Sequence, residues 1–132
     1  MSPARATAAA PAVGPAGGAR SLLLVEDDGS SAHALSLILR RYGWSVDVVA
    51  TVADALAYLD AHTPSAVILD LMLPDGSGAD VLARVRQRMP GVPVTVTTAS
   101  TDPERLAVVR SLQPKAVVRK PIDLAELLRT LQ

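Results

Sequence analysis

Polar and ionisable residues stand at the ends of several short aliphatic runs in this 132-residue chain. The residues at these positions are Glu26, Asp27, Asp70, Thr98 and Lys120. Carboxylates that a fold brings together repel one another, and partial burial raises that cost, so a cation or a lysine has to balance them. Oxygen atoms are the ligands that Mg²⁺ prefers. We therefore expect a Mg²⁺ site if the fold gathers these side chains, with one carboxylate left for further chemistry.

Each of these residues also has a purely structural explanation. An Asp between a strand and a helix is often only the cap of that helix, and a terminal Lys is often only a solvated charge. The recurrence of such residues at four of five expected strand ends is hard to explain by caps alone. His33 and His62, in contrast, lack the spacing of metal ligands, and we interpret them as surface or packing residues.

The elements that would position these residues follow from the hydrophobic pattern. Five short runs are predicted as strands: Ser21–Val25, Trp44–Ala50, Ala66–Leu69, Val92–Thr98 and Ala116–Arg119. Stretches with apolar residues at helical spacing separate these runs and follow the last one, as with Leu35, Ile38 and Leu39 in the first stretch. Strict alternation predicts an α/β fold of (βα)5 type, doubly wound, with helices on both faces of a five-stranded parallel sheet. Ligands bind beyond the carboxyl ends of the strands in such sheets, where the polar residues stand.

Composition narrows the possible function further. Lys plus Arg and Asp plus Glu each number 13, so the formal net charge is zero, which argues against nucleic-acid binding by bulk charge. The absence of Cys excludes disulfide scaffolds, thiol catalysis and Cys-type zinc sites. No apolar run approaches 18 residues, so no membrane-spanning helix is predicted. We expect a cytoplasmic domain.

Residues 1–20 form a separate compositional block with eight Ala, three Pro and three Gly. A segment without Leu, Ile or aromatic residues buries too little apolar surface to offset its ordering entropy, so it is predicted to be a disordered tail. A secretory signal is the alternative, but Pro11, Gly14 and Pro15 interrupt the apolar core that a signal needs. Residues 21–132 are predicted to form the single folded domain.

Four segments together resemble the receiver domain of two-component response regulators. They are LLLVEDD (Leu22–Asp28), VILDLMLPDGSG (Val67–Gly78), VTVTTAS (Val94–Ser100) and RKPID (Arg119–Asp123). The resemblance extends over residues 21–132, and the order and spacing of the segments make it specific. It implies a CheY-like, flavodoxin-like fold with strand order 2-1-3-4-5.

The resemblance also implies roles for the acidic residues. Asp70 is expected to be the phosphoacceptor, which takes a phosphoryl group from a phosphohistidine to form an acyl phosphate. Glu26 and Asp27 correspond to the acidic pair that holds Mg²⁺, with Asp27 as the direct ligand. Asp70 itself and the backbone carbonyl of Met72 are expected to complete the protein ligands.

Two further residues take roles from the same resemblance. Thr98 corresponds to the switch hydroxyl that hydrogen-bonds a phosphoryl oxygen. Lys120 corresponds to the cation that pairs with the phosphoryl group, or with Asp70 before phosphorylation. The peptide bond between Lys120 and Pro121 is expected to be cis, as in the family.

The sequence departs from the family at two places. Family members usually carry Tyr, Phe or His three residues before the Lys, and here that residue is Val117. An aliphatic side chain cannot make the ring movement that accompanies the displacement of the Thr, so the readout of phosphorylation is expected to differ. The segment Leu112–Ala116 also departs from the pattern of DNA-binding subfamilies, which weakens any inference about their mode of dimerisation.

The leading hypothesis is a Mg²⁺-dependent phosphoacceptor switch that changes its affinity for a partner. It is not an enzyme in the ordinary sense, although it assists its own phosphoryl transfer and dephosphorylation. The expected partners are a sensor histidine kinase or a histidine phosphotransferase and an unidentified downstream protein, with no nucleic acid and no membrane bound by the domain itself.

Two alternatives remain open. The first is a pseudo-receiver that docks to a partner independently of phosphorylation, for which Val117 is the only support. The second is a flavodoxin-like nucleotide binder on the same topology. The acidic loop Glu26–Asp28 argues against this second alternative, because its charge would repel a phosphate.

Overall fold

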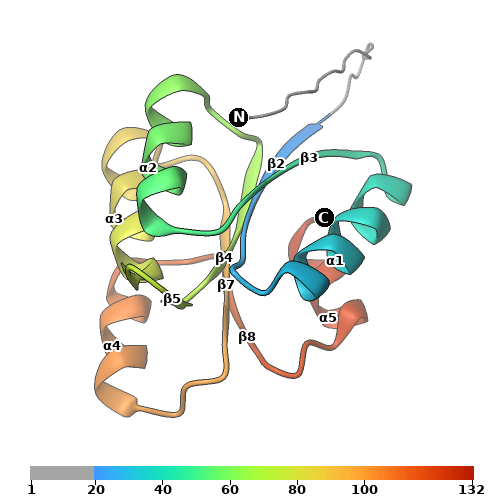
Figure 1. Ribbon diagram of the computed structural model, residues 1–132. Helices are drawn as coiled ribbons and strands as arrows, with labels where there is room; N and C mark the ends of the chain where they lie inside the picture. Colours follow the sequence, from blue (N-terminus) through green and yellow to red (C-terminus); the bar gives the residue numbers. More distant parts are fainter. Residues whose placement is uncertain (1–19) are drawn as a thin grey trace.

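The computed structural model describes residues 20–132, which form one parallel sheet between two layers of helices (Figure 1). The sheet strands are β2 (Arg20–Val25), β3 (Trp44–Val49), β4 (Ala66–Asp70), β7 (Val94–Thr98) and β8 (Ala116–Arg119). The helices are α1 (Gly29–Arg41), α2 (Val52–Ala61), α3 (Gly78–Arg88), α4 (Pro103–Ser111) and α5 (Leu124–Thr130). A small antiparallel hairpin of β5 (Met72–Leu73) and β6 (Gly76–Ser77) follows β4.

The strand order in the sheet is β3-β2-β4-β7-β8, and all neighbouring strands are parallel. Helices α1 and α5 cover one face, and α2, α3 and α4 cover the other (Figure 1). This arrangement confirms the predicted (βα)5 fold and the order 2-1-3-4-5 for its five main strands. The carboxyl ends of β2, β4 and β8 therefore lie at one edge of the sheet.

The strand sequences are almost wholly apolar because both faces of the sheet are covered. In β2, Leu23 and Val25 pack on the face of α2 and α3, whereas Leu22 and Leu24 pack on the face of α1 and α5. All five residues of β4 are buried, including Asp70 at its end. The last residue of this central strand is thus a carboxylate held in a mostly apolar environment.

The ends of several elements differ slightly from the predicted ones. Arg20 belongs to β2, where its guanidinium lies 4.2 Å from the ring centroid of Trp44 on the neighbouring strand. Strand β7 begins at Val94 instead of Val92, because Pro93 has no N–H to donate to a strand ladder. The predicted tail, apart from Arg20, lies outside the described residues. Within residues 20–132, no helix is long and apolar enough to cross a membrane.

Helix α4 is held more weakly than the other helices of its layer. Its single buried residue is Val109, while α3 buries Val81, Leu82 and Val85. The side chain of Asp102 caps α4 by accepting a hydrogen bond from the backbone N–H of Glu104, as its position before Pro103 predicts. Little apolar burial has to be given up if this helix moves.

Gly78 is required at the start of α3 by the close approach of two backbone segments. Its N–H donates to the carbonyl oxygen of Leu71 at 2.7 Å. A Cβ at this position would overlap the carbonyl oxygen of Asp70 and lie 3.1 Å from Cα of Leu71. The chain directly after Asp70 therefore depends on a residue without a side chain.

We expect Gly78→Ala to lower the free energy of unfolding by about 2–3 kcal/mol, because the new methyl group meets backbone atoms that cannot rotate away. Urea denaturation followed by circular dichroism measures this change. Gly29→Ala is the matched control, since a Cβ at Gly29 meets no atom within 4 Å, and its effect should stay within about 0.5 kcal/mol. Equal stabilities of the two variants would contradict the steric explanation.

Candidate functional site

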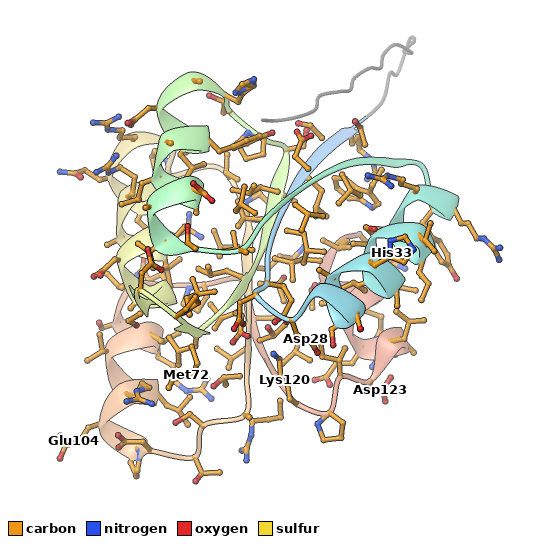
Figure 2. The ribbon with its side chains drawn as sticks, in the orientation of Figure 1. Asp28, His33, Met72, Glu104, Lys120 and Asp123 are labelled. Carbon is orange, nitrogen blue, oxygen red and sulfur yellow. The ribbon has the colours of Figure 1, made fainter. Side chains whose placement is uncertain are left out.

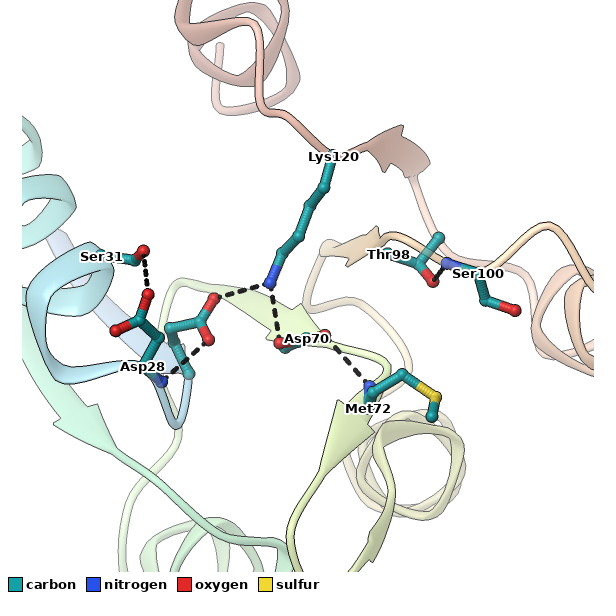
Figure 3. A network of polar contacts seen from close by, with 8 residues as sticks. Asp28, Ser31, Asp70, Met72, Thr98, Ser100 and Lys120 are labelled. Carbon is teal, nitrogen blue, oxygen red and sulfur yellow. Dashed lines mark hydrogen bonds and ion pairs between the residues drawn. The ribbon is translucent and has the colours of Figure 1, made fainter.

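Three side chains that are distant in the sequence, those of Glu26, Asp70 and Lys120, meet at the carboxyl edge of the sheet. Figure 2 shows Lys120, Asp28 and Met72 at this edge, and Figure 3 shows the contacts between the side chains there. The Nζ of Lys120 donates to Oδ2 of Asp70 at 2.8 Å and to Oε1 of Glu26 at 3.1 Å. The ammonium group thus links the ends of β2 and β4 to the segment after β8. The Lys120–Pro121 peptide bond is cis, as the family resemblance implies.

The two carboxylates at this edge are more buried than the ammonium that pairs with them. The side chains of Asp70 and Glu26 are 6% and 7% exposed, whereas the side chain of Lys120 is 27% exposed. Burial raises the pKa of Glu26, and the charge of Asp70 adds to the rise, against hydrogen bonds from Asp28 N–H and Lys120. Burial disfavours the charged form of Lys120, but its hydrogen bonds to Asp70 and Glu26 prevail and raise its pKa.

Asp27 adds a third carboxylate to the same group. One carboxylate oxygen from each of Glu26, Asp27 and Asp70 lies within 4.8 Å of the others, and Asp27 is exposed to solvent. Three negative charges thus face the single positive charge of Lys120. These oxygen atoms and the excess of negative charge fit a hard divalent cation such as Mg²⁺.

Backbone amides orient the two buried carboxylates. The N–H of Met72 donates to Oδ1 of Asp70 at 3.0 Å, and the N–H of Asp28 donates to Oε2 of Glu26 at 3.1 Å. Each carboxylate is therefore held by one backbone N–H and by the ammonium of Lys120. The side chain of Asp28 does not join the acidic group, because it accepts a hydrogen bond from the hydroxyl of Ser31 at 2.6 Å.

Thr98 lies at the end of β7 and is fully buried. Its backbone carbonyl accepts a hydrogen bond from the N–H of Lys120 at 2.9 Å, which ties the end of β7 to the lysine. Its hydroxyl accepts one from the N–H of Ser100 at 2.9 Å. Among residues 20–132, no hydrogen bond joins this hydroxyl to Asp70 or Lys120. The structure thus brings the side chains of Glu26, Asp27, Asp70 and Lys120 together, and Thr98 meets this group through its backbone carbonyl while its hydroxyl is paired with Ser100.

Asp75, in the hairpin after Asp70, has a positioning role that the sequence analysis missed. Its two carboxylate oxygens accept hydrogen bonds from the N–H groups of Val52 and Ala53 at 2.8 and 3.0 Å. These bonds lower the pKa of Asp75 and fasten the hairpin to the first turn of α2. The Pro-Asp-Gly sequence signals a turn, but the partner of the aspartate is 22 residues away in the chain.

The residues with other predicted roles take ordinary positions. His62 stacks on the ring of Tyr58 with 4.7 Å between ring centroids, and His33 is exposed on α1 (Figure 2), in agreement with surface or packing roles. Val117 is partly buried and packs against the core on the side of α2, α3 and α4. An aliphatic residue therefore fills the position where the family usually carries a ring.

Comparisons with known proteins show which family and which fold this chain is similar to. Residues 22–132 match the family described as "Response regulator receiver domain". The chain is 38% identical over 112 residues to the sensory transduction protein RegX3 of Mycobacterium tuberculosis, covering 85% of this chain and 49% of that protein. The chain thus spans about half the length of the curated relatives it matches.

Two solved structures illustrate the structural similarity. A CheY-like receiver domain protein from Methanospirillum hungatei superimposes with a TM-score of 0.82 at 24% identity, over 86% of this chain and 90% of that one. The BeF3-activated receiver domain of DrrB, a Thermotoga maritima protein, gives a TM-score of 0.74 at 27% identity, over 86% of this chain and 97% of that one.

We expect Asp27→Asn to stabilise the protein in the presence of EDTA, because it removes one of three mutually repelling carboxylates and breaks no bond to Lys120. The gain should reach up to about 1 kcal/mol and shrink as salt is added. Urea denaturation at low and high ionic strength measures both effects. Asp27→Glu keeps the charge and is the control, and an equal gain in that variant would refute the electrostatic explanation.

Proposed function

The chain belongs to the response regulator receiver domain family, and on that basis we propose that it is a switch controlled by phosphorylation of Asp70. The observation that carries this proposal is the environment of Asp70. Its carboxylate is buried at the end of the central strand, with Lys120 on Oδ2 and the N–H of Met72 on Oδ1. A carboxylate held in one orientation beside a cation is suited to accept a phosphoryl group.

The phosphoryl donor in this proposal is a phosphohistidine of a sensor histidine kinase or of a histidine phosphotransferase. An oxygen of Asp70 forms a bond to phosphorus while the P–N bond of the phosphohistidine breaks, and the electron pair of that bond stays on the imidazole nitrogen. Lys120 balances negative charge on the phosphoryl oxygens during the transfer. The protein acts as a phosphoacceptor that assists this step, and it does not turn over a separate substrate.

Mg²⁺ is the proposed cofactor of the same site. Glu26, Asp27 and Asp70 would hold it together with the backbone carbonyl of Met72, and Asp27 would be the more direct ligand of the acidic pair. The grouping of three carboxylate oxygens supports this assignment, because Lys120 alone does not balance their charge. When bound, Mg²⁺ supplies positive charge to the oxygens of the transferred group.

The output of the switch is a change in affinity for a downstream protein. The phosphoryl group carries about −1.5 to −2 charges on three oxygens, where the carboxylate of Asp70 carried one, and the hydroxyl of Thr98 is the proposed group that turns toward the phosphoryl oxygens. It would have to leave the N–H of Ser100, with which it is paired. The chain carries equal numbers of acidic and basic residues, which supports a protein partner over nucleic acid for this domain.

A docking module that works without phosphorylation is the second candidate function. Val117 favours it, because this side chain cannot provide the ring movement that usually follows the displacement of the Thr. The paired and buried Asp70 favours the phosphorylated switch instead, since a docking surface needs no such site.

Phosphorylation is tested by incubating the protein with Mg²⁺ and a small acyl phosphate and measuring its intact mass. We expect the mass to rise by one phosphoryl group in the wild type and to stay unchanged in Asp70→Asn, which removes the attacking oxygen. Asp28→Asn is the matched control and should still be phosphorylated, because its carboxylate bonds Ser31 and not the site. A gain in mass that survives Asp70→Asn, or none in the wild type, refutes the proposal.

Mg²⁺ binding is tested by thermal and urea unfolding with and without the ion. At a concentration about ten times its dissociation constant, Mg²⁺ should stabilise the wild type by about 1.4 kcal/mol. Asp27→Asn should lose most of this gain, while Asp28→Asn should keep it. An equal stabilisation of the wild type and Asp27→Asn by Mg²⁺ would show that the ion does not bind at Asp27.

A further inference from the structure

Arg105 of α4 places a positive charge beside the segment that carries Asp70. Its Nη1 lies 2.9 Å from Sδ of Met72, a residue that is 48% exposed. A thioether is only a weak hydrogen-bond acceptor and carries no charge. In the part of the chain that the structure describes, Arg105 forms no ion pair with a carboxylate. The contact that the guanidinium makes with Met72 is therefore a weak one.

Arg105 contacts Met72, whose backbone N–H bonds the oxygen of Asp70 that Lys120 does not bond. Lys120 is bonded to Oδ2 of Asp70, and the N–H of Met72 is bonded to Oδ1. Figure 3 shows Lys120 and Met72 on opposite sides of the Asp70 carboxylate, with the thioether directed farther away from Lys120. Because Arg105 contacts this thioether, its guanidinium lies near Met72, away from the ammonium of Lys120.

A phosphorylated site would carry more negative charge than its known cations balance. Lys120 is already shared between Asp70 and Glu26. Glu26, Asp27 and a phosphoryl dianion on Asp70 together carry more negative charge than Lys120 and one divalent ion can balance. A guanidinium suits the remaining charge, because its planar array of N–H donors matches phosphoryl oxygens.

We propose that Arg105 is a second cation for the phosphoryl group on Asp70, and this inference rests on the function proposed above. On phosphorylation the guanidinium leaves the thioether of Met72 and donates hydrogen bonds to a phosphoryl oxygen. Because α4 is anchored by Val109 as its only buried residue, the helix moves with Arg105. The phosphoryl group is thereby coupled to α4 without the aromatic residue that Val117 replaces.

The test uses beryllofluoride, a mimic of the phosphoryl group, because the DrrB receiver domain has been solved in a BeF3-activated state. The wild type, Arg105→Gln and Arg105→Lys are titrated with it in Mg²⁺, with binding followed by NMR. Arg105→Gln should bind about threefold to tenfold more weakly, the scale of a partly exposed charge-assisted hydrogen bond. Arg105→Lys keeps the charge and should recover most of the loss. The deficit of Arg105→Gln should shrink at high salt.

Arg110→Gln, an exposed arginine near the other end of α4, is the matched control and should bind as the wild type does. In the wild type, the Nε–H signal of Arg105 should also shift when beryllofluoride binds. A similar affinity of the wild type and Arg105→Gln overturns the inference and leaves the function of Asp70 intact. A deficit that is insensitive to salt and not recovered by Lys also overturns it, because it would assign Arg105 a packing role against Met72. Absence of beryllofluoride binding by the wild type overturns the proposed function together with the inference.

Discussion

The ammonium of Lys120 between the buried carboxylates of Asp70 and Glu26 is the interaction on which the site depends. Two carboxylates that are less than a tenth exposed would repel each other strongly without it. One lysine cannot balance three neighbouring acids, so the edge of the sheet retains an excess of negative charge. This excess of negative charge suits a hard divalent cation, whose preferred ligands are oxygen atoms.

The backbone around Asp70 is fixed by contacts of residues other than Glu26, Asp27 and Lys120. Gly78 lets the start of α3 lie against the carbonyl of Asp70, and Asp75 fastens the intervening hairpin to the first turn of α2. The N–H of Met72 then points at Oδ1 of Asp70. The orientation of the carboxylate is thus set by the rigid layer of α2 and α3 and does not rest on the lysine alone.

Helix α4 is the element through which phosphorylation of Asp70 can change the surface of a chain that carries Val117 in place of the usual aromatic residue. The core is tightly packed beneath α2 and α3, whereas α4 contributes only Val109 to it. A group that is weakly held can respond to a change of charge of the size that a phosphoryl group brings. The contact from Met72 to Arg105 is the link between that charge and this helix.

The sequence by itself determined the alternation of strands and helices, the fold class, and the strand ends at which Glu26, Asp27, Asp70, Thr98 and Lys120 stand. It could do so because buried strands, helix caps and turns each leave a local pattern in the residues. Only the tertiary structure decided that Lys120 bonds both Glu26 and Asp70, that Asp75 reaches α2, and that Arg105 rests on Met72. These pairs join residues that are 22 to 94 positions apart, so their distances depend on how layers pack and leave no periodic signal in the chain.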